Sequence, residues 1–307
     1  MKNLRFSLLV ILALGLSISI TACGQTPATP TRTIAPTATL APTATVAPTM
    51  EPGDSTRKLT VNGIERSYLL HIPPGVDSLQ PVSVVFVFHG QGERPADIQL
   101  LTEFNEVADK ASFLLIYPEG VGLAWNIGVC CGEAAEKKVD EAAFIRQILS
   151  DVGTIASVDP KRIYATGFSN GGLLVYQLAC EMSDVFAGIA PVAGALLYSP
   201  CQPKQPVSVL HVHGLADATV PYTGGGILDT PPVEQVIDTW VKLDSCTGAV
   251  QVDHPIEIVT HSVYASCQSG TTVELYTIDK GGHSWPSKYV LPISQIMVDF
   301  FNAHPKQ

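Results

Sequence analysis

The chain has 307 residues and a formal net charge of −10, with 28 acidic against 18 basic residues. This balance disfavours binding to nucleic acid or to an anionic membrane surface, both of which need clustered positive charge. Once the N-terminal segments described next are set aside, about 250 residues remain, which fits one globular domain.

The first 22 residues are typical of an export signal. Lys2 and Arg5 precede an apolar run, Phe6–Ile20, that is shorter than the about 20 residues a membrane span needs. Ala22 and Cys23 then resemble a bacterial lipobox, which implies cleavage before Cys23 and lipid attachment to it. An ordinary secretory signal with a chance cysteine is the alternative. We expect an exported protein at the bacterial cell surface or in the periplasm, held to the membrane by the lipid anchor only.

Residues 23–53 have no capacity to build a core. They are dominated by Pro, Thr and Ala, and Ala35–Leu40 recurs with one change as Ala41–Val46. Because proline favours extended structure and removes backbone donors, we expect a semi-rigid tether of at most about 3.1 Å per residue. The globular domain is then expected to occupy residues 54–307.

Strand and helix patterns alternate through this domain, beginning with a hairpin at Asn62-Gly63. The segments that predict strands are Lys58–Asn62, Glu65–Ile72, Val82–Phe88, Phe113–Tyr117, Arg162–Ala165, Phe186–Val192, Val207–Val212, Glu257–Tyr264 and Thr272–Ile278. Those that predict helices are Ile98–Ala111, Asp140–Val152, Leu173–Met182, Val233–Leu243 and Leu291–Phe301. This alternation predicts an α/β fold with a mostly parallel sheet and helices on both faces. Functional sites in such sheets gather at the carboxyl ends of the strands.

The body of the chain contains an even number of cysteines: Cys130, Cys131, Cys180, Cys201, Cys246 and Cys267. In an exported chain this favours disulfides. The last two bracket one local segment and are predicted to pair. Cys130 and Cys131 are then expected to form disulfides with Cys180 and Cys201 in some order. A metal site is the alternative, but no C-x-x-C spacing or nearby His pair supports it.

A Gly-x-Ser-x-Gly motif, Gly167, Ser169 and Gly171, lies between a predicted strand and a predicted helix. This context is typical of a nucleophile elbow, in which a tight turn exposes the serine hydroxyl. The alternative is a simple strand–turn–helix connection with Ser169 as the helix N-cap.

A serine nucleophile needs a base, and the base needs an acid to orient it. His283 follows the last predicted strand in a Gly-rich loop, and Asp217 follows the strand Val207–Val212. The order Ser, Asp, His along the chain is the order found in α/β-hydrolases. His211 and His213 lie at the end of a strand before any suitable acid, so we do not choose them as the base. Asp217 is also compatible with turn capping, and its rivals as the acid are Asp244, Asp253 and Asp279.

An oxyanion needs two aimed donors. The backbone N–H of Asn170, directly after the serine, is one candidate, and that of Gln91 in the loop His89–Gly92 is the other. Trp125 and Trp285 are candidate walls for an aromatic acyl group or a sugar, with core or loop packing as the alternative. Asp140, at the start of its helix, is expected to cap it or to interact with the helix dipole.

Together these motifs resemble one family of secreted esterases, which includes feruloyl esterases, acetyl xylan esterases and polyhydroxybutyrate depolymerases. The resemblance extends from about Arg57 to Asn302. The matching pieces are His89-Gly90, Trp125–Gly132, Val139-Asp140, Gly167–Gly172, His213–Asp217 with Val220–Tyr222, and Gly282–Pro286.

The resemblance implies an α/β-hydrolase fold and carboxylic ester hydrolysis through an acyl-enzyme, with the triad Ser169, Asp217 and His283. Many depolymerase members carry a cysteine where this chain has Gln91, and we find no polymer-binding domain. We therefore expect a feruloyl or acetyl esterase acting on small esters or acylated plant polysaccharide. A hydroxyalkanoate oligomer hydrolase and a catalytically silent surface binding protein are the alternatives. We expect a monomer and no metal or organic cofactor.

Overall fold

The computed structural model describes residues 50–77 and 79–307. Within these residues one sheet contains the strands β1 (Gly53–Val61), β2 (Ile64–Ile72), β3 (Val82–Phe88), β4 (Leu114–Pro118), β5 (Val158–Phe168), β6 (Gly188–Val192), β7 (Ser208–Gly214), β8 (Gln251–Ile256), β9 (Val259–Tyr264) and β10 (Val273–Ile278). The α-helices are α1 (Pro95–Thr102), α2 (Phe104–Ala111), α3 (Gly132–Glu136), α4 (Glu141–Val152), α5 (Asn170–Glu181), α6 (Val233–Leu243) and α7 (Ile293–Ala303).

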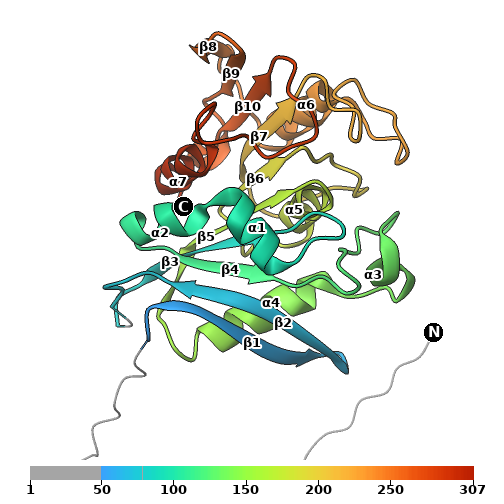
Figure 1. Cartoon of the computed structure of the whole chain (residues 1–307). Coiled ribbons are helices and arrows are strands. Elements are labelled where there is room, and N and C mark those ends of the chain that lie inside the picture. The colour runs from blue at the N-terminus through green and yellow to red at the C-terminus, as the bar shows by residue number, and fades with distance from the viewer. Residues whose placement is uncertain (1–49, 78) are drawn as a thin grey trace, which may run out of the picture. The chain divides into compact units, whose positions relative to one another are not determined.

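The strands run across the sheet in the order β1-β2-β4-β3-β5-β6-β7-β10-β9-β8 (Figure 1). From β4 through β10 in this order, neighbouring strands pair in parallel. The pairs at both edges are antiparallel. The mostly parallel sheet predicted from strand–helix alternation is therefore confirmed.

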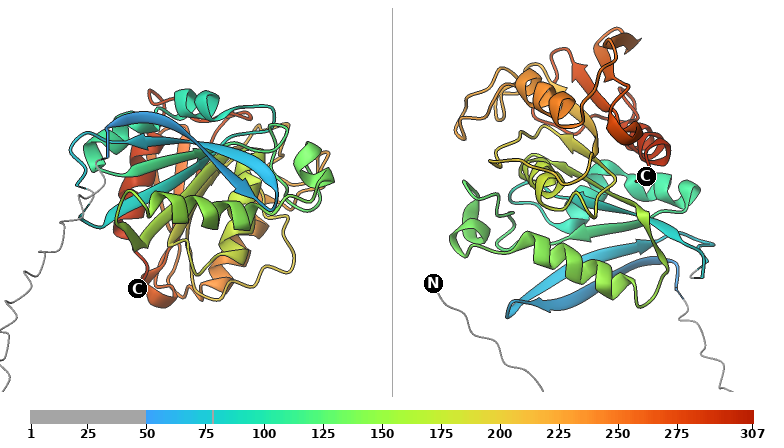
Figure 2. Two further views of the ribbon diagram at one scale, coloured as in Figure 1. Left: turned by 90° about the horizontal axis from the view of Figure 1, so that it is seen from below. Right: turned by 180° about the vertical axis from the view of Figure 1, so that it is seen from behind.

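Helices cover both faces of this sheet (Figure 2). Val84, Phe86 and Phe88 of β3 join a core cluster that also contains residues of α4, α5 and α6. Val85 and Val87 point the other way, into a cluster with residues of α1, α2 and α7. Because both faces of β3 are buried, its sequence is a continuous apolar run rather than an alternating one.

The helix expected over Ile98–Ala111 is instead two helices, α1 and α2. Glu103 between them adopts a left-handed conformation with φ 49°. The Ser294 hydroxyl of α7 donates to the Thr102 carbonyl oxygen at 2.7 Å, so a distant helix satisfies an acceptor at the end of α1. The prediction of one continuous helix was wrong: neither the left-handed Glu103 nor this tertiary contact is visible in the helical pattern of the sequence.

Disulfides join Cys130 to Cys131, Cys180 to Cys201 and Cys246 to Cys267. The predicted pairing of the last two is confirmed, but the expectation that the first two would reach the middle two is wrong. The sulfur of Cys131 lies 3.6 Å from Asn170 Nδ2 at the start of α5, whereas Cys180 lies near the end of that helix. The rise of α5 places Cys180 about 15 Å from Asn170. A disulfide tolerates at most about 7 Å between Cα atoms, so Cys131 cannot pair with Cys180.

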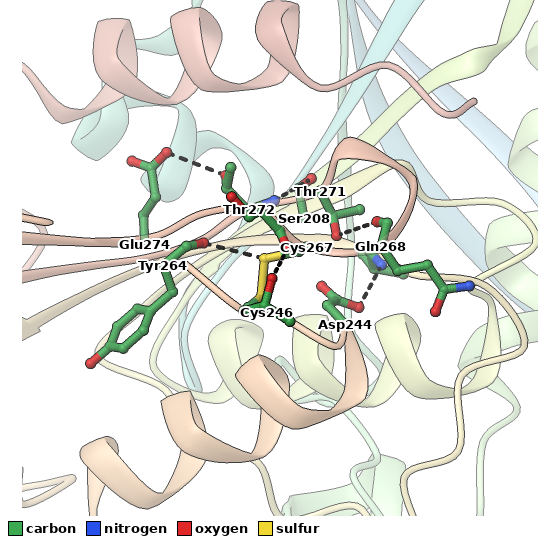
Figure 3. Close-up of a disulfide and its surroundings, with 12 residues drawn as sticks. Ser208, Asp244, Cys246, Tyr264, Cys267, Gln268, Thr271, Thr272 and Glu274 are labelled. Atoms are coloured by element: carbon green, nitrogen blue, oxygen red, sulfur yellow. Dashed lines mark hydrogen bonds between the residues drawn. A yellow bond between two sulfur atoms is a disulfide. The ribbon is translucent and has the colours of Figure 1, made fainter. Parts of the chain in front are cut away.

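A buried carboxylate lies beside the third disulfide (Figure 3). Asp244 follows α6 and has no exposed surface. Its Oδ1 accepts from the Val207 N–H at 3.3 Å, and its Oδ2 has no partner among the described residues. Its main-chain oxygen accepts from the Gln268 N–H at 2.8 Å. Burial raises the pKa of Asp244 to about 7, because an ionised carboxylate is poorly stabilised away from water.

The predicted export signal, Cys23 and all but the last few residues of the predicted tether lie outside the described residues. Over residues 50–77 and 79–307, no helix has the length and apolar character required to cross a bilayer. The described residues all belong to one compact unit.

Candidate active site

Ser169 lies on the sharp turn between β5 and α5, at the carboxyl edge of the sheet. Its backbone angles are φ 54° and ψ −118°, a conformation that costs energy for a residue with a Cβ atom. The turn is held because Ser169 N–H donates to the Val192 oxygen at 3.0 Å and Leu173 N–H donates to the Ser169 oxygen at 2.9 Å. A Cβ at Gly171 would overlap the carbonyl oxygen of Phe88, so only glycine lets α5 begin directly against the end of β3.

The three side chains predicted as a triad meet at this edge. Ser169 Oγ lies 2.8 Å from His283 Nε2, and His283 Nδ1 lies 2.8 Å from Asp217 Oδ2. Since a carboxylate only accepts, the Nδ1 proton of His283 points to Asp217 and leaves Nε2 free to accept from the serine hydroxyl. The arrangement can therefore remove a proton from the serine during an attack on a carbonyl carbon.

Asp217 is held from its other side by the turn that carries it. Its Oδ1 accepts from the N–H groups of Thr219 at 2.8 Å and Val220 at 2.9 Å. The Asp217 side chain has no exposed surface, whereas 18% of the His283 side chain is exposed. Asp217 therefore also caps its own turn, as the alternative interpretation expected. Its Oδ1 caps the turn and its Oδ2 contacts His283.

The rivals for the acid lie elsewhere. Asp253 is exposed on the edge strand β8, and Asp244 is buried beside the third disulfide. Asp279 precedes His283 in the same loop, where it is exposed. Within the described residues, none of these three makes a hydrogen bond or ion pair with His283, whose partner is Asp217.

The two predicted oxyanion donors have no hydrogen-bond acceptor within the described residues. The N–H groups of Gly90 and Gly92 donate to Glu93 Oε2 and to the Leu123 oxygen. Between them, the Gln91 N–H has no acceptor among residues 50–77 and 79–307, and the same holds for the N–H of Asn170 at the start of α5. Both predicted oxyanion donors are therefore available to a ligand.

Trp125 is not a substrate wall, and this prediction is corrected. Its side chain has no exposed surface and packs edge-on against Phe88, with ring centroids 5.2 Å apart. Its indole Nε1–H donates to the His89 oxygen at 2.8 Å, and its backbone N–H donates to Asn170 Oδ1 at 2.8 Å. Trp125 thus ties together the two loops that carry the free donors.

His89 is a further buried residue of the same region. The backbone N–H of Gly120 donates to its Nε2 at 3.0 Å, so its proton lies on Nδ1 and is donated to the Gly90 oxygen at 2.7 Å. Burial lowers the pKa of His89, so the ring stays neutral and fixes the backbone before Gln91.

Trp285 is only 6% exposed but lines a groove of about 490 Å³ between the α1–α2 segment and residues 285–295. Its role as a substrate contact stays a prediction. Asp140 caps α4 as expected, since its Oδ1 accepts from the Ala143 N–H at 2.8 Å.

The sequence reasoning missed one buried group. His211 and His213 lie side by side on β7, and Tyr176 of α5 contacts the first of them. The spacing of two positions places both imidazoles on the same face of the strand. That periodicity is the signal that could have drawn attention to them.

Comparison with known proteins is consistent with this geometry. The family model described as "Esterase PHB depolymerase" matches residues 66–216, a range that includes Ser169 and ends before Asp217 and His283. The chain is 32% identical over 307 residues to "Putative esterase NocK" of Nocardia uniformis subsp. tsuyamanensis, covering 90% of this chain and 88% of that protein. It is 34% identical over 176 residues to feruloyl esterase B of Piromyces equi, covering 53% of this chain and 32% of that longer protein.

Solved structures share the fold at low sequence identity. The acetyl xylan esterase from Aspergillus awamori superimposes with a TM-score of 0.59 at 12% identity, covering 81% of this chain and 99% of that one. The feruloyl esterase module from Clostridium thermocellum, solved with sinapinate, gives 0.55 at 13% identity, covering 84% and 89%.

The fold is thus that of the α/β-hydrolase esterases, which defines the class of protein. Within this class, the chain belongs to the esterase PHB depolymerase family and is a carboxylic ester hydrolase.

Proposed function

We propose that the chain hydrolyses carboxylic esters through an acyl-enzyme, with Ser169 as nucleophile, His283 as general base and acid, and Asp217 as the group that orients His283. The observation that carries this proposal is the continuous set of contacts from Ser169 Oγ through His283 to Asp217, both of 2.8 Å. The base is therefore already within reach of the proton it must take.

In the first half-reaction, His283 Nε2 takes the proton from Ser169 as the oxygen attacks the ester carbonyl. The buried Asp217 carboxylate stabilises the imidazolium that forms. The N–H groups of Gln91 and Asn170 receive the negative charge that develops on the carbonyl oxygen. Collapse of this intermediate breaks the bond to the alcohol, which leaves with the proton from His283.

In the second half-reaction, His283 removes a proton from water, which attacks the acyl-enzyme carbonyl. The same two donors hold the oxyanion, and its collapse releases the carboxylic acid and returns the proton to Ser169. This scheme needs no group beyond the residues named.

For the substrate, we propose a feruloyl or acetyl ester of plant polysaccharide. Relatives named feruloyl esterase and a structural neighbour named acetyl xylan esterase support this choice. A hydroxyalkanoate oligomer is the second candidate, favoured by the description of the matching family model. Gln91, where many depolymerases have cysteine, weighs against the second candidate.

For location, we propose export, with lipid attached to Cys23 and residues 23–53 as the tether of a domain over 54–307. Three disulfides in the described domain support an oxidising compartment. Processing of the chain blocked by globomycin, and release of a Cys23→Ala variant into the medium, are the expected results. Normal processing in the presence of globomycin would favour an ordinary secretory signal.

The purified full chain should be tested on p-nitrophenyl acetate, methyl ferulate, acetylated xylan and hydroxybutyrate oligomers. Ser169→Ala should lower kcat by about 10⁶-fold if the three residues act as a unit. An organophosphonate should label the wild type at Ser169. A wild-type chain that neither turns over any of these esters nor reacts with the phosphonate would instead be a silent binding protein.

A further inference from the structure

A continuous line of hydrogen bonds leads from the helix of the nucleophile to the loop of the acid. The Tyr176 hydroxyl on α5 lies 2.8 Å from His211 Nδ1, and His211 Nε2 lies 2.9 Å from His213 Nδ1. His213 Nε2 lies 2.8 Å from the Val220 oxygen and 3.5 Å from Asp217 Oδ2. The esterase mechanism above makes no use of these three side chains.

The proton positions in this line follow from one acceptor. The Val220 oxygen can only accept, so His213 carries its proton on Nε2 and its Nδ1 accepts. His211 must then donate from Nε2, which leaves its own Nδ1 to accept from the Tyr176 hydroxyl. With both rings neutral, every ring nitrogen has one partner of the right kind.

A second proton on His213 would break this order. Its Nδ1–H would face His211, which would have to move its own proton to Nδ1 and point it at the Tyr176 oxygen. The Tyr176 hydroxyl hydrogen would then need another acceptor, and the part of the chain that the structure describes offers none. Leaving a buried donor unpaired costs about 1–3 kcal/mol, so the hydroxyl of Tyr176 holds both rings in their tautomers.

Among the described residues, Asp217 is the one charged group paired with either ring. His211, His213 and Tyr176 have at most 1% exposed surface. The Tyr176 ring stacks on Trp240 of α6, and the ring of Tyr222 meets His213 edge-on. Across Asp217 lies His283, whose imidazolium would repel a charged His213. Burial also lowers the pKa of both His211 and His213.

We propose that Tyr176, His211 and His213 are positioning residues of the esterase: they hold a neutral His213, whose Nε2–H donates to the Val220 oxygen, and thereby fix the acid loop relative to the helix of the nucleophile. This proposal rests on the proposed roles of Asp217 and His283. A neutral His213 ring, 3.5 Å from Asp217 Oδ2, does not compete with the His283 imidazolium for the charge of that carboxylate. It also holds the Val220 oxygen, and with it the turn whose N–H groups bind Asp217 Oδ1.

The tautomers can be read directly in the wild-type full chain labelled with ¹⁵N-histidine. Two of its histidines should be neutral Nε2–H tautomers that do not titrate between about pH 5 and 8, where an ordinary histidine changes charge. His211→Gln and His213→Gln variants assign their signals. Titration of His213 in this range, or an Nδ1–H tautomer of either ring, would overturn the proposal.

Tyr176→Phe removes only the hydroxyl that locks the tautomers. We expect kcat for p-nitrophenyl acetate to fall about three- to tenfold, the value of one buried hydrogen bond, with KM changed by less than about twofold. The matched control is Tyr164→Phe, which removes the hydroxyl of another fully buried tyrosine that has no hydrogen-bond partner in the described residues. That control should keep wild-type kcat.

The two proposals fail in different ways. If wild type and Ser169→Ala are equally inactive, the proposed mechanism fails, while the tautomer measurement still tests the histidine line. If wild type is active but Tyr176→Phe matches it in kcat and in the ¹⁵N signals of both rings, the positioning role is wrong and the triad stands. If Tyr176→Phe does not fold, the wild-type measurement alone decides.

Discussion

Replacing Trp125 with phenylalanine tests how the candidate oxyanion hole is built. The change removes the indole N–H that donates to the buried His89 oxygen at 2.8 Å. It keeps an aromatic ring in the core and the backbone N–H that binds Asn170 Oδ1. The variant therefore releases the loop before Gln91 while leaving the side chain of Asn170 tied.

Two contributions set the expected loss in the free energy of unfolding of Trp125→Phe. An unpaired buried acceptor costs about 1–3 kcal/mol, and the smaller ring forfeits about 1–2 kcal/mol of burial, so unfolding should become easier by about 2–5 kcal/mol. One complete oxyanion donor is worth about 2.7–4 kcal/mol in the transition state. Because the Gln91 N–H is loosened rather than deleted, we expect kcat to fall about 10- to 100-fold with little change in KM.

The assay is kcat and KM for p-nitrophenyl acetate beside unfolding in denaturant, with Trp240→Phe as the matched control. Trp240 is equally buried in the same core cluster, but its indole nitrogen has no partner among the described residues. That control should lose the packing term and, because Trp240 stacks on Tyr176, lower kcat by no more than the about three- to tenfold expected for Tyr176→Phe. A Trp125→Phe enzyme that is as active as Trp240→Phe would refute the role of the Trp125 indole N–H in holding the loop before Gln91.

Three further predictions concern the acid, the buried carboxylate and the third disulfide. Asp217→Asn should lower kcat by about 10⁴-fold, because an amide does not select the Nδ1–H tautomer of the base; residual activity near the wild type would reassign the acid. Asp244 ionises near pH 7 when folded but near about 4 when unfolded, so the unfolded state binds fewer protons in this window and stability falls as pH rises through it. Asp244→Asn should remove this slope and gain up to about 4 kcal/mol over wild type above pH 7, measured by denaturant unfolding at several pH values; parallel curves for both proteins would contradict it. Replacing both Cys246 and Cys267 with serine should cost about 3 kcal/mol of stability, the value for a loop of this length, without changing kcat.

Most of the fold follows from patterns that are local in sequence. The continuous apolar run Val82–Phe88 and the amphipathic run Val233–Leu243 have the same bounds in the structure as in the prediction. Edge strand β8 was not predicted because it is exposed throughout and contains Pro255, which removes a backbone donor and weakens the strand pattern. The break at Glu103 lies beside a tertiary contact, from the Ser294 hydroxyl to the Thr102 oxygen, that the neighbouring residues do not signal.

The candidate site likewise contains some residues that local sequence patterns predict and others whose roles depend on tertiary packing. Chain order and strand ends were sufficient to select Ser169, Asp217 and His283, because parallel strands deliver their carboxyl ends to one edge. Whether Trp125 points into the core or toward a substrate depends on packing between β3 and α5, which no spacing encodes. The line through His211 and His213 needed knowledge that α5 covers the same face of β7.

The glycines of the elbow and the triad contacts carry different information about activity. Gly171 is required wherever α5 begins against the end of β3, and a silent protein with this fold would need it equally. Packing does not explain why a carboxylate without exposed surface faces a histidine that in turn reaches the half-buried Ser169. Burying Asp217 is costly unless its charge is used or compensated, and stabilising an imidazolium next to Ser169 is a use that the fold itself does not require. The contacts of His283, rather than the Gly-x-Ser-x-Gly motif, are therefore the stronger argument for an esterase over a binding protein.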